Sequence, residues 1–241
     1  NYQTIKGEIK AIDNISFALD NEEVLCIVGS SGCGKSTLLE LIAGLIPIET
    51  GSLLYPACNK TPAIGYMLQK DHLLEHRTIY KNIILGLEIQ HRLTEKNLEY
   101  VQKLMRQYGI ADFASSYPRE LSGGMRQRAA LIRTLALKPE FLLLDEPFSA
   151  LDYQTRLDVS DDIAKIIRQS GVTTLLVTHD LSEAISIADR IIVLGKRPGH
   201  IRKIVTIDFK TNKKLSSKEA RIHPKFQEYF NQIWKELKAD E

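Results

Sequence analysis

The 241-residue sequence contains little cysteine, with only Cys26, Cys33 and Cys58. None of the three pairs with another at the short spacing of a metal-ligand motif, and an odd number argues against a secreted disulfide framework. The pattern therefore favours a protein of the reducing cytoplasm.

Long apolar runs are also missing. The longest runs, such as Val24 to Val28 and Phe141 to Leu144, are far shorter than the roughly 20 residues that a helix needs to cross a bilayer. We therefore expect no helix of this chain to cross a membrane.

The sequence has no sustained block of one charge. Its 32 basic and 30 acidic side chains are interspersed and leave a formal net charge of +2, so composition gives no sign of nucleic-acid binding. The basic stretch from Lys210 to Lys218, which includes Lys213 and Lys214, is expected to be a solvated loop, with a lipid-surface patch as the alternative. A hydrophobic content of 44% is enough to fill the core of one large domain or two small ones.

The order of the expected elements indicates an α/β fold. Apolar and polar residues roughly alternate from Ile9 to Phe17, which predicts a strand. The apolar run from Val24 to Val28 predicts a buried strand before a glycine-rich turn and a helix. Two more buried-strand patterns, Phe141 to Leu144 and Thr173 to Val177, are separated by a helical pattern from Tyr153 to Gln169. This alternation is typical of parallel α/β architecture.

Domain boundaries are expected where the pattern changes. Residues 1–79 and 138–210 are predicted to form the core, residues 80–137 an inserted helical subdomain, and residues 211–241 a C-terminal tail. A helix that begins at Pro224 would place apolar residues on one face, namely Phe226, Phe230, Ile233, Trp234 and Leu237. We expect this stripe to pack on the core, with a cofactor or partner site as the alternative.

The segment from Gly29 to Ser36 matches the pattern G-x-x-x-x-G-K-[ST] of a phosphate-binding loop, and it lies after a predicted buried strand and before a predicted helix. Glycines let the backbone curl so that successive N–H groups converge on phosphate oxygens, and the helix dipole adds a favourable field. The sequence therefore predicts a site for ATP, built from Gly29, Ser30, Ser31, Gly32, Cys33, Gly34, Lys35, Ser36 and Thr37.

Single residues of this loop have separate expected roles. Lys35 would neutralise the β- and γ-phosphates, Ser36 would give its hydroxyl to Mg2+, and Thr37 would reach the α-phosphate. Cys33 lies at a helix N-terminus near a lysine, where a thiol pKa falls and reactivity rises, and its alkylation is expected to block ATP binding by bulk. The simpler alternative is that any small residue fits at this position.

Two carboxylates, Asp145 and Glu146, end the strand that begins at Phe141. Ligands in open α/β sheets bind at the carboxyl edge of the strands, where Asp145 is suited to hold Mg2+ through its water shell and Glu146 to orient and deprotonate the attacking water. His179 follows another predicted strand and would contact the γ-phosphate from the same edge; a simple cap is the alternative.

The segment from Leu121 to Arg128 places Ser122, Gly123 and Gly124 at the start of a predicted helix, which makes a second anion site. Together with the phosphate loop, this segment resembles the signature motif of the ABC ATPase family, with Met125 in place of the usual glutamine. The resemblance covers nearly the whole chain. It implies a P-loop NTPase core, with a mostly parallel sheet and an antiparallel β edge, and an inserted helical signature subdomain.

The resemblance also implies roles for further residues. Gln69 is the Q-loop glutamine, a Mg2+ ligand beside Ser36 and Asp145, and it links the metal to the helical subdomain. His179 is the switch histidine, and Tyr2 is the aromatic that stacks on adenine. The D-loop is formed by Ser149, Ala150, Leu151 and Asp152.

The assembly implied by the resemblance is a head-to-tail homodimer. In it, the signature residues of one subunit, Leu121 to Gly124, cover the ATP that is bound to the phosphate loop of the other. Closing on ATP then moves the surface that grips a membrane subunit.

Within the family, the chain is similar to the nitrate, sulfonate and taurine importer group in two segments, Tyr66 to Arg77 and Gly195 to His200. An ATPase that is not fused to membrane helices favours a separate importer subunit at the cytoplasmic face of the membrane, which acts with permease subunits and, indirectly, with a substrate-binding protein. His76 stands where relatives often carry tryptophan, so the contact to the permease is expected to differ. The alternative is a non-transport ABC ATPase that acts on DNA or ribosomes, but the 241 residues contain neither the long coiled-coil insertion nor the second ATPase domain usual in such proteins.

Zinc-dependent hydrolysis is an alternative function of another class. It rests on His72 to His76, which matches the inverted zinc-protease motif H-x-x-E-H. Both histidines would face one metal if the segment were helical. No third ligand is evident, and the segment directly follows Gln69, where the family docks its membrane subunits.

Overall fold

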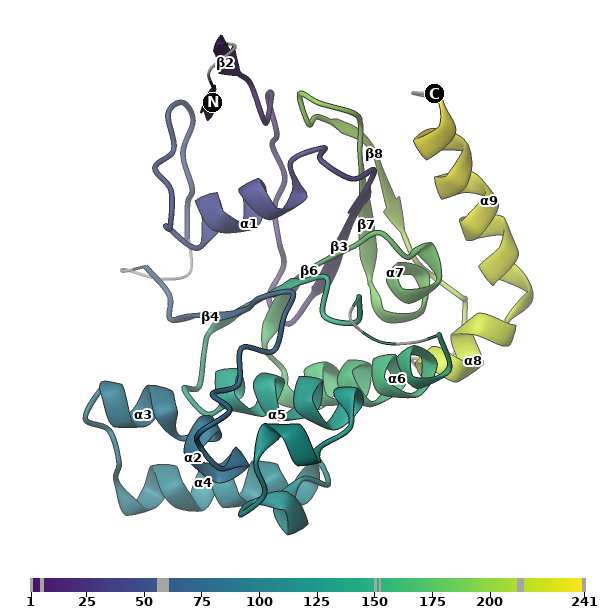
Figure 1. Ribbon diagram of the computed structural model, residues 1–241. Coiled ribbons are helices and arrows are strands. Elements are labelled where there is room, and N and C mark those ends of the chain that lie inside the picture. The colour runs from purple at the N-terminus through teal and green to yellow at the C-terminus, as the bar shows by residue number, and fades with distance from the viewer. Residues whose placement is uncertain are drawn as a thin grey trace. The chain divides into compact units, whose positions relative to one another are not determined.

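The computed structural model describes residues 2–4, 7–55, 61–149, 151, 153–211 and 215–239, with the backbone alone for residues 2–4, 7–9 and 153. The chain forms two compact units (Figure 1). Unit 1 contains residues 1–62 and 171–241, and unit 2 contains residues 63–170.

The sheet of unit 1 is built around β3 (Val24–Gly29), all of whose residues are buried. It pairs in parallel with β6 (Thr173–Thr178) on one side and with β7 (Arg190–Leu194) on the other, and β8 (Ile201–Thr206) pairs antiparallel with β7. A strand between two parallel neighbours is buried on both faces, which explains the continuous apolar run in the sequence.

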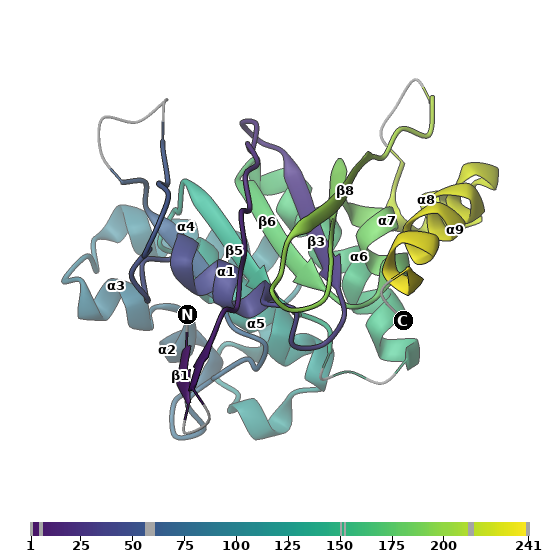
Figure 2. The same cartoon turned by 90° about the horizontal axis from the view of Figure 1, so that it is seen from above.

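Helices cover both faces of this sheet. Figures 1 and 2 show α1 (Lys35–Ile42) on one face and α7 (Leu181–Ile187) on the other, where α8 (Ser217–Ile222) and α9 (Pro224–Lys238) follow. A separate antiparallel pair is formed by β1 (Tyr2–Thr4) and β2 (Gly7–Ile9).

The strand expected from Ile9 to Phe17 is wrong beyond Ile9. Residues 10–17 form no strand, apart from an isolated bridge between Ile12 and Gly199. Alternating polarity reports that one side of a segment is buried, but a strand also needs a neighbour along its whole length.

The tail helix α9 packs on α7, β7 and β8. The predicted apolar stripe is confirmed at Ile233, which is fully buried, but Trp234 is 46% exposed. The ring of Trp234 stacks on Phe230 with centroids 6.1 Å apart, and the ammonium group of Lys238 lies over the Trp234 ring at 5.0 Å from its centroid. The apolar face of α9 is thus wider than the part of it that packs against the rest of unit 1.

Lys213 and Lys214 of the basic stretch lie outside the described residues.

Unit 2 has two parallel strands, β4 (Ile64–Met67) and β5 (Phe141–Asp145). Residues 68–140, all of them described, contain no strand. They form helices α2 (Ile79–Ile83), α3 (Leu85–Ile89), α4 (Glu95–Gln107) and α5 (Gly123–Leu135), with two short 3-10 turns, η1 (Ala111–Phe113) and η2 (Pro118–Glu120).

The last helix of unit 2, α6 (Tyr153–Ser170), packs against α5 and is 18 residues long. Within the described ranges, no helix combines the length and the apolar character needed to cross a bilayer. The predicted α/β class, with a mostly parallel sheet and an antiparallel edge, is confirmed, whereas the domain boundaries expected from the sequence stay a prediction.

Candidate functional site

The glycine-rich loop of unit 1 connects the buried end of β3 to the first turn of α1. Gly32 and Gly34 have φ values of +75° and +106°, in the left-handed region that favours glycine. A Cβ on Gly34 would also lie 3.0 Å from the carbonyl oxygen of Ala11. The loop therefore requires glycine at both positions to keep its path.

Lys35 is held inside the loop. Its side chain is buried, and Nζ donates hydrogen bonds to the carbonyl oxygens of Gly29 at 2.8 Å and Ser30 at 3.0 Å. These bonds fix the positive charge between the end of β3 and the N-terminus of α1, where backbone N–H groups and the helix dipole already favour an anion.

Cys33 is only 1% exposed, and a Cβ on Gly29 would lie 2.7 Å from its sulfur. Burial raises the pKa of the Cys33 thiol, and this outweighs the opposing charge of Lys35. The prediction of a lowered pKa and a reactive thiol is wrong, because the sulfur faces the packed side of the loop. Cys33 acts here as a small apolar side chain.

The sequence did not single out Gly199 as a residue of the phosphate loop. Its N–H donates to the carbonyl oxygen of Ala11 and its own carbonyl accepts from the N–H of Asp13, both at 2.8 Å. A Cβ on Gly199 would lie 2.1 Å from the carbonyl oxygen of Cys33, so this turn supports the loop by direct backbone contact. Its signal in the sequence is a Pro-Gly dipeptide, which indicates only a turn.

His179 follows β6 directly. Thr178, the last residue of β6, lies opposite Val28 of β3, so His179 and the phosphate loop begin at the same strand edge. The hydroxyl of Thr178 donates to Oε2 of Glu183 at 2.6 Å, and Asp180 caps α7. The backbone on both sides of His179 is therefore held in place.

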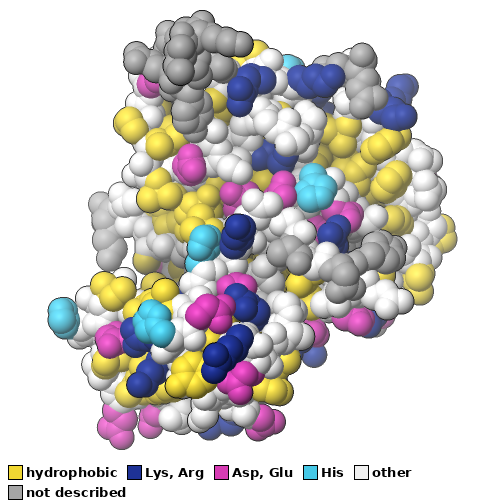
Figure 3. Space-filling view, viewed as in Figure 1, with side chains coloured by type: hydrophobic (Ala, Val, Ile, Leu, Met, Phe, Trp, Pro, Cys, Tyr) yellow, Lys and Arg dark blue, Asp and Glu magenta, His cyan; other side chains and the backbone are white. Residues whose placement is uncertain are grey.

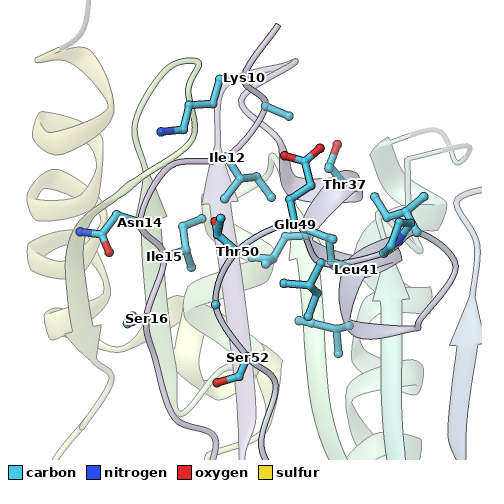
Figure 4. Close-up of a pocket in the computed structure, with 17 residues that line it drawn as sticks. Lys10, Ile12, Asn14, Ile15, Ser16, Thr37, Leu41, Glu49, Thr50 and Ser52 are labelled. Atoms are coloured by element: carbon cyan, nitrogen blue, oxygen red, sulfur yellow. The ribbon is translucent and has the colours of Figure 1, made fainter. Parts of the chain in front are cut away.

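A cavity of about 670 Å3 lies beside α1 in unit 1. Figure 4 shows its lining, with Lys10, Ile12, Asn14, Ile15 and Ser16 on one side, Thr37 and Leu41 of α1 on the other, and Glu49, Thr50 and Ser52 between them in this view. Pockets of this size hold small organic ligands. Because Thr37 belongs to the predicted phosphate site, the cavity gives unit 1 a ligand-sized space next to that site. Tyr2 lies in β1, and its side chain is outside the described residues.

In unit 2, the parallel register places Met67 opposite Leu144. Gln69 and Glu146 each follow two residues later, and Nε2 of Gln69 donates to Oε2 of Glu146 at 3.3 Å. The same nitrogen donates to Oγ of Ser149 at 3.1 Å, and that hydroxyl donates to the carbonyl oxygen of Glu146 at 3.0 Å. The structure thus brings together one residue each of the Q-loop, the acidic pair and the D-loop.

The backbone of Glu146 has φ +44°, which is unusual for a residue with a side chain. Such a conformation costs on the order of 1–3 kcal/mol and is often found at functional sites. Asp145 is buried at the end of β5. Leu151 is buried as well, while Ala150 and Asp152 of the predicted D-loop lie outside the described residues.

The predicted signature residues form the N-terminus of α5. Ser122 is the N-cap, and its Oγ accepts from the N–H of Met125 at 3.4 Å. A Cβ on Gly124 would lie 2.4 Å from Cγ2 of Val159 in α6, and one on Gly123 would lie 2.9 Å from Cδ2 of Leu151. The two glycines therefore allow close packing, and they leave the helix N-terminus with a serine hydroxyl and bare backbone. Leu121, just before the cap, is buried.

The helix that the zinc-motif alternative requires is not formed. Residues 71–74 have no regular structure and residues 75–76 form a turn, so His72 and His76 do not share a helix face. Glu75 instead forms an ion pair with Arg126 at 3.1 Å. Over the part of the chain that the structure describes, no group of three or more His, Cys, Asp and Glu side chains is placed to hold a metal ion.

A lysine-bearing glycine loop between a parallel strand and a helix, in a sheet flanked by helices, is the arrangement of P-loop nucleoside triphosphatases. Comparison with known families narrows this class, since the family model described as "ABC transporter" matches residues 12–149. The chain therefore belongs to the ABC transporter family. It is an ATP-binding cassette of an ABC transporter and hydrolyses ATP.

Curated relatives match along nearly their whole length. The chain is 44% identical to an uncharacterized ABC transporter ATP-binding protein, YtlC, of Bacillus subtilis (strain 168), with 99% of this chain and 92% of the relative covered. It is 37% identical to the nitrate import ATP-binding protein NrtD of Synechocystis sp., with 98% and 91% covered. It is 36% identical to the aliphatic sulfonates import ATP-binding protein SsuB of Bacillus licheniformis, with 98% and 91% covered.

The fold is also similar to that of a solved structure, the dimeric post-hydrolysis state of the ATP-binding cassette MJ0796 bound to ADP and Pi. The TM-score is 0.71 at 26% sequence identity, with 86% of this chain and 95% of that chain covered.

Proposed function

We propose that the chain is the ATP-hydrolysing motor subunit of an ABC importer, and that it drives solute uptake through a separate permease. The observation that carries this proposal is a pair of helix N-termini that each suit an anion, one after the glycine-rich loop at α1 and one at the Ser122 N-cap of α5. Two such sites suit an ATP molecule that is held by one subunit and covered by another. The MJ0796 cassette, which is dimeric and bound to ADP and Pi, supports a nucleotide-bound dimer.

In this proposal the phosphate loop, Gly29 to Thr37, binds the triphosphate, and Lys35 contributes the charge. Mg2+ would be held by Ser36, Gln69 and Asp145, which offer hydroxyl, amide and carboxylate oxygens, the hard donors that this cation prefers. Gln69 uses its amide nitrogen in the bonds to Glu146 and Ser149, so its amide oxygen is the atom for the cation. Bound Mg2+ would supply charge neutralisation on the phosphates.

Glu146 would act as the general base that takes a proton from the attacking water. Gln69 would help to orient that water, because its amide already lies against the Glu146 carboxylate. His179 would contact the γ-phosphate from the end of β6, and Tyr2 would stack on adenine. A correctly placed base contributes about 10²- to 10⁴-fold to the rate.

The partner copy in the homodimer would add Leu121, Ser122, Gly123 and Gly124 over the nucleotide. Its D-loop, Ser149, Ala150, Leu151 and Asp152, would lie next to this contact. Closing of the dimer would then be coupled to the permease at the cytoplasmic face of the membrane.

The nitrate, sulfonate and taurine group is favoured as the importer type. Support comes from the segments Tyr66 to Arg77 and Gly195 to His200 and from the two import relatives, NrtD and SsuB. These relatives carry different solute names at almost the same identity, so the permease and a substrate-binding protein are expected to select the solute.

A non-transport ABC ATPase that acts on DNA or ribosomes is the second candidate. Long coiled-coil insertions are usual in that class, whereas the longest helix in the described ranges has 18 residues.

The test that separates the two functions is purification of the tagged chain from membranes. We expect the chain to be recovered with an integral membrane permease. We also expect its ATPase activity to rise when a loaded substrate-binding protein is added. Recovery only with DNA or ribosomes would contradict the proposal.

A further inference from the structure

An ion pair joins the segment after β4 to the signature helix in unit 2. Nε of Arg126 donates to Oδ2 of Asp71 at 2.9 Å, and Nη2 donates to Oδ1 at 3.2 Å. A two-point contact between a guanidinium group and a carboxylate fixes distance and orientation together. In Figure 3, acidic and basic side chains lie next to one another over the region where Figure 1 draws α2 to α5.

Further contacts strengthen this connection. Nη1 of Arg126 lies 3.1 Å from Oε1 of Glu75. Arg133, two turns further along α5, donates to the carbonyl oxygens of Asp71 at 2.6 Å and His72 at 2.8 Å. Two arginines of one helix therefore hold the segment from Asp71 to Glu75 by its side chains and by its backbone.

The pair is partly shielded from water, with side-chain exposures of 17% for Asp71 and 27% for Arg126. Burial alone would raise the pKa of Asp71, but the hydrogen bonds from Arg126 and from the N–H of Leu73, with the charges of Arg126 and Arg133, bring the net pKa below its ordinary value. The hydrogen bond to Asp71 raises the pKa of Arg126. Both partners are therefore charged at neutral pH.

Asp71 and Arg126 lie next to two segments of the candidate site, the Q-loop and the signature segment. Asp71 comes two residues after Gln69, whose amide contacts Glu146. Arg126 lies in the first turn of α5, and its N–H donates to the carbonyl oxygen of Ser122 at 3.0 Å. Glu146 is thus connected to the N-cap of the signature helix by the hydrogen bond to Gln69, the two-residue step along the chain to Asp71, and the contacts that Arg126 makes.

We propose that Asp71 and Arg126 are positioning residues that tie the location of Ser122, Gly123 and Gly124 to that of Gln69. The ion pair makes the two segments move as one piece, so a change at the Q-loop glutamine reaches the surface that covers the partner's ATP. The inference rests on the proposed function, because Ser122 has this task only in an ATP-bound dimer.

The test compares Arg126→Ala, Arg126→Lys, Asp71→Asn and the double variant Asp71→Asn/Arg126→Ala in the full chain. Three quantities are measured: the Kd of the monomer for ATP, kcat, and ATP-dependent dimer formation in a Glu146→Gln background. We expect an unchanged ATP Kd, because the phosphate loop is made by unit 1. We expect kcat to fall by on the order of 10-fold or more, since a misplacement of about 1 Å can cost about 100-fold.

The double variant should be no worse than the worse single variant, because both changes break one connection. Arg126→Lys keeps the charge but not the two-point contact and should lie between wild type and Arg126→Ala. It also provides the answer if Arg126→Ala does not fold. Asp162→Asn is the matched control, because it breaks the ion pair of Arg128, on the same helix, with α6.

The inference is overturned if Arg126→Ala and Arg126→Lys keep the kcat of wild type and the dimerisation of the Glu146→Gln parent, or if Asp162→Asn lowers both equally. It is also overturned if the two single effects add fully. Failure of the proposed dimeric ATPase looks different, because the Glu146→Gln parent, with Asp71 and Arg126 intact, would then show no ATP-dependent dimer.

Discussion

The side-chain amide nitrogen of Gln69 lies 3.3 Å from Oε2 of Glu146. This contact follows from the parallel register of β4 and β5, in which Met67 lies opposite Leu144, and Gln69 and Glu146 each follow two residues later in the chain. The residue expected to orient the attacking water and the residue expected to deprotonate it are thus aligned by backbone pairing. A shift of one residue in that pairing would separate them.

Glu146→Gln is expected to keep ATP binding and to lower kcat by about 10²- to 10⁴-fold, because the amide cannot accept the proton. The variant should also accumulate as an ATP-bound dimer, which size-exclusion chromatography with and without ATP would detect. Glu99→Gln, on the exposed side of α4, is the matched control. Normal hydrolysis by Glu146→Gln would exclude Glu146 as the base.

Lys35→Ala is expected to weaken ATP binding itself, because it removes the charge that the loop carbonyls of Gly29 and Ser30 hold in place. Titration calorimetry with ATP measures the effect directly. Lys103→Ala, an exposed change on α4, should bind ATP like wild type. Equal affinity of Lys35→Ala and wild type would contradict the phosphate role of Lys35.

Gly199→Ala is expected to disturb the phosphate loop from outside it. The new Cβ would lie 2.1 Å from the carbonyl oxygen of Cys33, so the loop must shift. Overpacking of this kind costs about 1–3 kcal/mol, and ATP affinity should fall along with the free energy of unfolding. Urea unfolding and ATP titration check both effects, with the exposed change Lys196→Ala as control. Wild-type affinity in Gly199→Ala would show that the turn does not support the loop.

Cys33 should make stability depend on pH in the alkaline range. Burial raises the pKa of the Cys33 thiol above its ordinary value, so the folded state favours the neutral thiol. This contribution to the free energy of unfolding is fully present below the unfolded-state pKa and is lost as pH rises through the folded-state pKa. The unfolding free energy of wild type minus that of Cys33→Ala should therefore fall from pH 7 to pH 10. If wild type instead became more stable relative to Cys33→Ala as pH rose, the assigned direction of the Cys33 pKa shift would be wrong.

The parts of the fold that the sequence predicted are those coded locally. The run from Val24 to Val28 is apolar throughout because β3 has parallel neighbours on both sides, and the glycines that follow are fixed by their own φ values. The run of four apolar residues before Asp145 likewise forms β5. Such signals need no knowledge of distant residues.

The rest depends on partners that are far away in the chain. Asp71 and Arg126 are 55 residues apart, and Gln69 and Ser149 are 80 apart, so no periodicity or motif links them. Gly199 looks like an ordinary turn glycine until Cys33 lies against it. The same gap explains the strand wrongly expected along residues 10–17, where alternating polarity was compatible with a strand that tertiary contacts did not form.

The partly exposed indole on α9 has a practical consequence. Trp234 is the single tryptophan of the 241 residues. Its emission on excitation near the red edge of protein absorbance therefore comes from one known place, the outer surface of the tail helix. Intrinsic fluorescence can follow the surroundings of that helix in the unmodified protein, and quenching by acrylamide can report whether another molecule covers it, without any added label.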